Sequence, residues 1–299
     1  MMTPDFGDVD DLALGGGPVR VYRFGPPTGP VVVLLHGAGL DTARGVWRRV
    51  APALGQAGYR VIAVDWPRHG GSRPWDGVLD DAFCRLFVEE LLDQLEVDRC
   101  VLMGLSLGGG VAIGFALDFP ERVRALVVLG PGGLEERRPW QFVTWAFLRV
   151  PGLLRWMTTW YARRPGRVRR QMEGYLVAGA ATPDFDEIVR DIAAEAAQKD
   201  AHGERILDDW QIHAYGPFRM RLHLLPWVDA LRCPSLWVRG ERDQLVRGRD
   251  VEAAAEASGG RFVSIPDAGH IVTYDQPDAV IAETLRFLDE VAPANTGSD

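Results

Sequence analysis

Residues 101–110 read Val-Leu-Met-Gly-Leu-Ser-Leu-Gly-Gly-Gly, an apolar run that meets a cluster of glycines with one hydroxyl, Ser106, between them. A serine on a sharp turn between a strand and a helix takes a strained backbone conformation. Its neighbours two residues away on either side then crowd each other. Glycine at positions 104 and 108 removes that conflict. We therefore predict a strand that ends before Ser106, a tight turn that exposes its hydroxyl, and a helix that begins near Leu107.

Short apolar runs alternate with amphipathic segments on both sides of this turn. Such alternation is typical of an α/β fold with a mostly parallel central sheet flanked by helices on both faces. Apolar residues at helical spacing predict helices over residues 83–95 and from Pro277 to residue 291. The predicted strands are residues 31–35, 60–64, 100–103, 125–129, 235–238 and 261–265.

The middle of the chain has a different pattern. Residues 134–227 show helical periodicity, no convincing strand, and six of the ten tryptophans. We interpret them as a helical cap inserted into the core. The predicted domains are a first part of the core over residues 1–133, the cap over 134–227 and a second part of the core over 228–299.

Composition excludes several classes of protein. A chain of 299 residues with 47% hydrophobic side chains can bury a full core, and its net charge of −8 without a basic stripe argues against nucleic acid as a partner. The acidic start is unlike a signal peptide, and no apolar run is long enough to span a membrane. Three scattered cysteines predict neither disulfides nor a metal site. We expect a cytoplasmic protein without integral membrane association; its oligomeric state is left open.

At this point the sequence resembles the α/β-hydrolase superfamily. The resemblance covers about residues 19–134 and 228–291 and leaves the predicted cap unmatched. One departure is Arg68, which stands where the family usually has glycine. The matching stretches are His36-Gly37-Ala38-Gly39, Trp47 with Pro52 and Leu54, Asp65-x-Pro67-x-His69-Gly70-x-Ser72, Gly104-x-Ser106-x-Gly108, Phe119-Pro120-Glu121-Arg122-Val123, Gly240-x-x-Asp243 and Asp267-x-x-His270.

The resemblance implies a catalytic triad of Ser106, Asp243 and His270. A serine hydroxyl is a weak nucleophile that needs a base, and the base needs a partner that fixes its tautomer. Asp243 and His270 both follow predicted strands, at the edge where open α/β sheets place their ligands. The alternatives are Glu241 and Asp267 for the acid, and His36, His69, His202, His213 and His223 for the base.

The same resemblance implies an oxyanion hole made by the backbone N–H groups of Leu107 and Ala38, with Gly39 as the alternative to Ala38. Gly39, Leu40 and Trp140 are the candidate substrate-binding residues. Leu40 and the leucines beside Ser106 suggest a non-polar floor, whereas tryptophans in a helical cap also serve simply to pack it against the core.

We therefore predict a serine hydrolase that cleaves a carboxylic ester, or a related acyl bond, of a small and largely apolar substrate through an acyl-enzyme, without metal or cofactor. The serine disfavours relatives that use aspartate as nucleophile. The same triad also serves carbon–carbon bond hydrolases, thioesterases, lactonases, perhydrolases and lyases. A non-catalytic ligand-binding protein with this fold is a further alternative.

Overall fold

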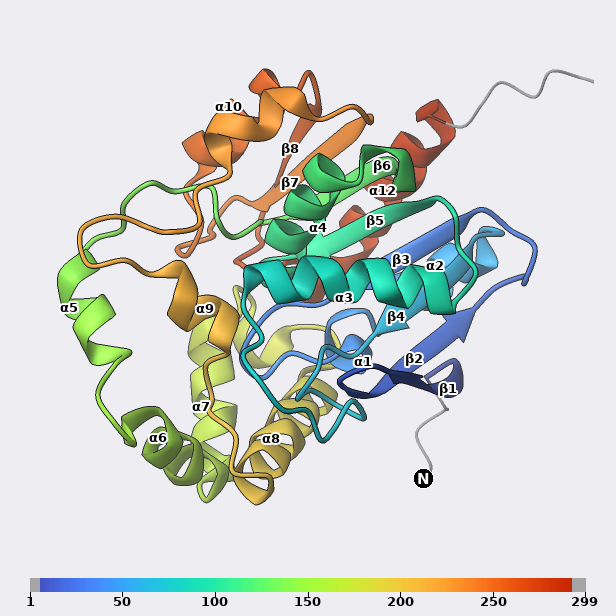
Figure 1. Ribbon diagram of the computed structural model, residues 1–299. Helices are drawn as coiled ribbons and strands as arrows, with labels where there is room; N and C mark the ends of the chain where they lie inside the picture. Colours follow the sequence, from blue (N-terminus) through green and yellow to red (C-terminus); the bar gives the residue numbers. More distant parts are fainter. Residues whose placement is uncertain (1–5, 292–299) are drawn as a thin grey trace, which may run out of the picture.

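A computed structural model describes residues 6–291 (Figure 1). Within that range one sheet contains eight strands in the order β1-β2-β4-β3-β5-β6-β7-β8. Strands β3 to β8 run parallel, whereas β2 pairs antiparallel with both β1 and β4. The strands are β1 (Asp8–Leu14), β2 (Gly17–Phe24), β3 (Val31–Leu35), β4 (Arg60–Val64), β5 (Cys100–Leu105), β6 (Val123–Leu129), β7 (Ser235–Gly240) and β8 (Arg261–Ile265).

The six predicted strands are confirmed as β3 to β8. Most of them are continuous apolar runs because both faces of a parallel sheet are covered. In β3, Val32 and Leu34 join the core cluster on one face, while Val33 and Leu35 join the cluster on the other. The hairpin β1–β2 was not among the predicted strands, because Asp8–Leu14 is rich in aspartate and mostly exposed or half-buried at the sheet edge.

Helices cover both faces of the sheet (Figure 1). Side chains of α3, α4 and α10 form one core cluster with the sheet, and those of α2 and α12 belong to the other. The helices of the core are α1 (Ala43–Val46), α2 (Val50–Gln56), α3 (Asp81–Gln94), α4 (Leu107–Asp118), α10 (Gly248–Ala257), α11 (Val272–Asp275) and α12 (Pro277–Val291).

The chain between β6 and β7 is helical, and its described part contains no strand beyond an isolated bridge between Tyr215 and Met220. These helices gather on one side of the sheet in Figure 1. Met172 and Ile188 from two of them enter the core cluster of α2 and α12. The helices are α5 (Gln141–Phe147), α6 (Leu153–Ala162), α7 (Pro165–Tyr175), α8 (Phe185–Ala201) and α9 (Asp209–Ala214).

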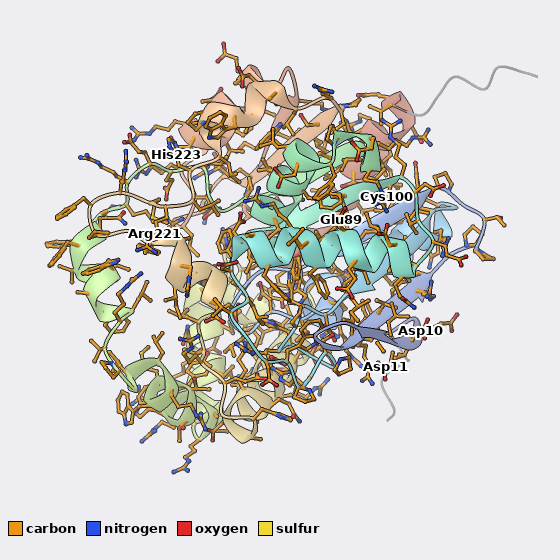
Figure 2. The ribbon with its side chains drawn as sticks, viewed as in Figure 1. Asp10, Asp11, Glu89, Cys100, Arg221 and His223 are labelled. Carbon is orange, nitrogen blue, oxygen red and sulfur yellow. The ribbon has the colours of Figure 1, made fainter. Side chains whose placement is uncertain are left out.

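Two further sequence predictions concern cysteines and membrane spans. All three cysteines are buried and unpaired, including Cys100 at the start of β5 (Figure 2). No helix within residues 6–291 combines the length and apolarity needed to cross a membrane. The predicted core segments also include residues 1–5 and 292–299, which lie outside the described part of the chain.

Candidate active site

Ser106 occupies the turn between β5 and α4, with φ of +52° and ψ of −110°. A Cβ atom on Gly104 would lie 2.3 Å from the carbonyl oxygen of Gly108, and one on Gly108 would lie 2.1 Å from the carbonyl oxygen of Leu35. Both positions therefore require glycine, as the sequence predicts. Leu107 is the first residue of α4, so its N–H has no partner inside the helix and is available to a ligand.

His270 and Asp243 form the best-defined polar contact near this turn. Asp243 follows β7, His270 follows β8, and His270 Nδ1 lies 2.9 Å from Asp243 Oδ2. The other carboxylate oxygen accepts the N–H groups of Leu245 at 2.7 Å and Val246 at 3.0 Å. Burial opposes ionisation of Asp243, but the contact with His270 and the two amides outweigh it and lower the pKa of the carboxyl. An ionised Asp243 accepts the Nδ1 proton and leaves Nε2 of a neutral His270 as the basic nitrogen.

Ser106, His270 and Ala38 line one cavity of about 180 Å³. Within residues 6–291 the Ser106 hydroxyl makes no hydrogen bond to His270, so the two groups are related through the cavity they share. Most of the wall comes from the helical segment between β6 and β7. The other residues that line the cavity are Gly132, Gly133, Arg138, Thr144, Leu148, Leu207, Trp210, Gln211, Ala214, Tyr215, Met220, Leu245 and Val246.

The candidate substrate residues Gly39, Leu40 and Trp140 are absent from this lining. Trp140 is 80% exposed at the start of α5. The tryptophan in the cavity is Trp210, which the sequence offers only as one of six in the helical segment. Trp210 Nε1 donates to Asp81 of α3 at 2.9 Å, a contact that helical periodicity does not predict.

A second and larger cavity of about 350 Å³ shares Leu207 and Trp210 with the first. Leu107 and Trp75 contribute to its wall, but Ser106 and His270 do not. We place the candidate reaction centre in the smaller cavity because only that one contains the hydroxyl and the imidazole.

The turn after β3, residues 36–41, is called the β3 turn below. Nε2 of His36 accepts the N–H of Trp66 at 3.1 Å, so the proton of the ring is on Nδ1, which lies 2.7 Å from the Gly37 carbonyl. Burial lowers the pKa of His36 well below its usual value, which keeps this ring neutral. The N–H of Gly39 donates to Asp208 at 2.7 Å and is already engaged, in contrast to its predicted role as the alternative oxyanion donor.

The alternative acids and bases lie elsewhere. Asp267 has φ of +51° in the turn after β8 and pairs with Arg242, while Glu241 is exposed. His202 and His213 are exposed. His223 lies on the segment between α9 and β7 (Figure 2). It lines a surface hollow that contains neither Ser106 nor His270.

The Asp65 motif stabilises loops next to the site. Asp65 is fully buried and accepts the N–H groups of Ala43 at 2.9 Å and Gly71 at 3.0 Å. Arg68, the departure from the family pattern, has φ of +64°, a conformation that glycine adopts without strain. Its guanidinium donates to Asp209 at 3.1 Å, so the arginine links this loop to α9.

In the described part of the chain, no group of three or more His, Cys, Asp or Glu side chains is arranged to hold a metal ion.

Comparisons with known proteins agree with this fold. A family model described as alpha/beta hydrolase fold matches residues 30–277. An uncharacterized protein of Mycobacterium tuberculosis is 28% identical over 287 residues, which cover 92% of this chain and 80% of that protein. A 2-hydroxy-6-oxo-6-phenylhexa-2,4-dienoate hydrolase of Burkholderia cepacia is 39% identical over 123 residues, 38% of this chain and 41% of that protein. The solved structure of a Bacillus subtilis carboxylesterase has a TM-score of 0.70 at 22% identity and covers 95% of this chain and 92% of its own.

Proposed function

This chain belongs to the α/β-hydrolase fold family, and on that premise we propose that it is a serine hydrolase that cleaves carboxylic esters of small, largely apolar substrates. The observation that carries the proposal is the 2.9 Å contact between His270 and Asp243, with His270 facing the same cavity as Ser106. Fold alone does not define chemistry, so the proposal depends on this arrangement of side chains.

In the proposed reaction, the Ser106 hydroxyl attacks the ester carbonyl while Nε2 of His270 takes its proton. Asp243 holds the ring by Nδ1 and stabilises the imidazolium. The N–H groups of Leu107 and Ala38 donate to the tetrahedral oxyanion. His270 then protonates the leaving alcohol as the C–O bond breaks. Water, deprotonated by the same histidine, then attacks the acyl carbon. The bond from that carbon to Ser106 Oγ breaks, His270 returns its proton to Oγ, and the carboxylic acid is released.

The size and lining of the cavity support a small substrate. About 180 Å³ is below the ~300–1,000 Å³ of pockets that hold drug-sized ligands. Leu148, Leu207, Trp210 and Met220 make much of its wall apolar. Arg138 and other polar side chains add a limited hydrogen-bonding capacity at the same wall.

We further propose that residues 134–227 act as a cap over the core. The segment supplies most of the cavity wall, including Trp210, while Ser106 and His270 come from the turns of the sheet. This division of roles assigns substrate selection to the cap and bond cleavage to the core.

Carbon–carbon bond hydrolysis is the second candidate. The observation that favours it is the 39% identity, over 123 residues, to the Burkholderia cepacia dienoate hydrolase. The two candidates are separated by comparing kcat/KM for 4-nitrophenyl butanoate with that for 2-hydroxy-6-oxo-6-phenylhexa-2,4-dienoate. Much faster cleavage of the dienoate would replace the ester assignment.

Replacement of the nucleophile tests both candidates together. Ser106→Ala keeps a small side chain on the strained turn, so we expect a folded protein whose kcat on its best substrate falls at least about 10⁴-fold. Circular dichroism and thermal melting serve as folding controls. Retention of a tenth of the wild-type rate would exclude Ser106 as nucleophile.

A further inference from the structure

The β3 turn is anchored on both sides of Ala38. Before it, His36 accepts the N–H of Trp66 at 3.1 Å. After it, the N–H of Gly39 donates to Asp208 Oδ2 at 2.7 Å, across 169 positions of sequence. The peptide that carries the Ala38 N–H therefore lies between one anchor within the core and another supplied by the segment before α9.

Asp208 is itself held by two buried side chains. Its Oδ1 accepts a hydrogen bond from Lys199 Nζ at 3.1 Å, and His69 Nε2 lies 3.3 Å from its Oδ2. Lys199, on α8, is the only lysine of the chain and is 1% exposed. A buried ammonium group requires such a partner. Burial opposes ionisation of Asp208, but His69, Lys199 and the Gly39 amide together hold the pKa of its carboxyl well below its usual range.

Asp208 also stands at the beginning of α9. Its N–H donates to the side chain of Gln211 at 3.0 Å, and α9 carries Trp210 and Ala214 on the cavity wall. The same residue thus joins α8, the start of α9 and the β3 turn. Its polar contacts within residues 6–291 do not include Ser106 or His270, and Asp208 does not line their cavity.

We propose that Asp208 is a positioning residue: its carboxylate fixes the Gly39 amide and thereby directs the neighbouring Ala38 N–H toward the oxyanion. This inference rests on the proposed function, because it requires an oxyanion at that position. Loss of the acceptor frees the second half of the β3 turn. The consequence is weaker stabilisation of the transition state with little change in ground-state binding.

The sharpest test compares two double variants that both remove the buried charge pair. Asp208→Asn with Lys199→Met retains a side-chain oxygen for the Gly39 N–H, whereas Asp208→Ala with Lys199→Met retains none. On 4-nitrophenyl butanoate we expect kcat of the alanine variant to fall on the order of 10- to 100-fold, with KM changed less than about 3-fold. The asparagine variant should recover most of that loss. Binding of a trifluoromethyl ketone, which forms a tetrahedral adduct with serine, should weaken in parallel with kcat/KM.

Asp191→Asn is the matched structural control. Asp191 lies on α8 and pairs with Arg48 of the core, so this change removes the charge of an ion pair between the helical segment and the core, the two parts that the Asp208–Gly39 contact also joins. It leaves the β3 turn untouched, and we expect kcat within about 2-fold of wild type, with ordinary thermal destabilisation.

The proposal would be overturned if the two double variants had equal kcat. It would also be overturned if Asp191→Asn lost as much kcat as the alanine double variant. If either double variant does not fold, the single variant Asp208→Asn is measured instead. Its kcat must stay within about 5-fold of that of wild type, and a larger loss would overturn the proposal. Failure of the proposed function has a different signature, because Ser106→Ala would then retain activity whatever residue stands at position 208.

Discussion

One cavity is formed by two kinds of element: the turns after β5, β7 and β8, and the helices between β6 and β7. The sequence specifies these two kinds of element in different ways. Each turn is defined by a few neighbouring residues. Gly104 and Gly108 permit the backbone of Ser106, and two amides that follow Asp243 in sequence hold its carboxylate. The local sequence therefore carries the information for these positions.

The wall of the cavity depends instead on distant contacts. Trp210 donates to Asp81 at 2.9 Å, 129 positions away, and Asp208 accepts the Gly39 amide across 169 positions. Side chains of α7 and α8 pack into a core cluster built mainly by other elements. The difference teaches that the side chains of the proposed reaction centre are placed by short motifs, whereas the shape of the cavity is set by tertiary packing.

The largest effect is expected from a change in a turn. In Asp243→Asn an amide replaces the carboxylate beside His270 Nδ1 and favours the wrong tautomer of the ring. We expect kcat to fall about 10³- to 10⁴-fold in a folded protein. Asp267→Asn, in the turn before His270, is the control and should stay within 2-fold of wild type. Similar losses in both variants would show that the turn, and not the Asp243 carboxylate, matters.

An intermediate effect is expected at Asp41, which ends the β3 turn. Burial raises the pKa of this carboxyl to about 7, despite the opposing influence of His270 and His69. The unfolded residue ionises near pH 4, so wild type loses stability as the pH rises from about 4 to 7. Asp41→Asn lacks this loss. Urea unfolding should give nearly equal free energies of unfolding at pH 4, and an advantage of roughly 2 to 4 kcal/mol for the variant at pH 8.

This account would be contradicted if the free energies of unfolding of Asp41→Asn and wild type differed by the same amount at pH 4 and at pH 8. It would mean that folding leaves the pKa of the Asp41 carboxyl unchanged, so that this group makes no pH-dependent contribution to stability.

The smallest effect is expected on the cavity wall. Trp210→Phe preserves an aromatic ring but removes the donor to Asp81. We expect KM and the preferred acyl-chain length to change, with kcat/KM for the best substrate altered about 3- to 10-fold. Trp227→Phe provides a control, since Trp227 is exposed and lies outside this cavity. If Trp210→Phe lost as much activity as Asp243→Asn, the cavity wall would matter as much for catalysis as the turns, which would contradict this account.

Much of the core was predictable because its strands are continuous apolar runs and its turns carry short motifs. The six parallel strands and the glycines around Ser106 follow from such local signals, whereas the contact between Asp243 and His270 is one that the family resemblance implied. The β1–β2 hairpin lacks that signal because Asp8–Leu14 lies at the sheet edge and exposes its aspartates.

The residues that line the cavity were less predictable from the sequence. Trp140 and Trp210 lie in the same tryptophan-rich helical segment, yet Trp140 is exposed and Trp210 is buried. The engagement of Gly39 by Asp208 also leaves no trace in the local sequence. Lys199 is the single lysine among 33 basic residues, but its burial follows only from the fold.

The central claim is that Ser106 is an activated nucleophile in the cavity it shares with His270. The most direct measurement is intact-protein mass spectrometry after incubation with a small fluorophosphonate, on wild type and Ser106→Ala in parallel. We predict one covalent adduct on wild type, located at Ser106 by peptide mapping, and none on the variant. The absence of an adduct on wild type, or an equal adduct on both proteins, would contradict the claim.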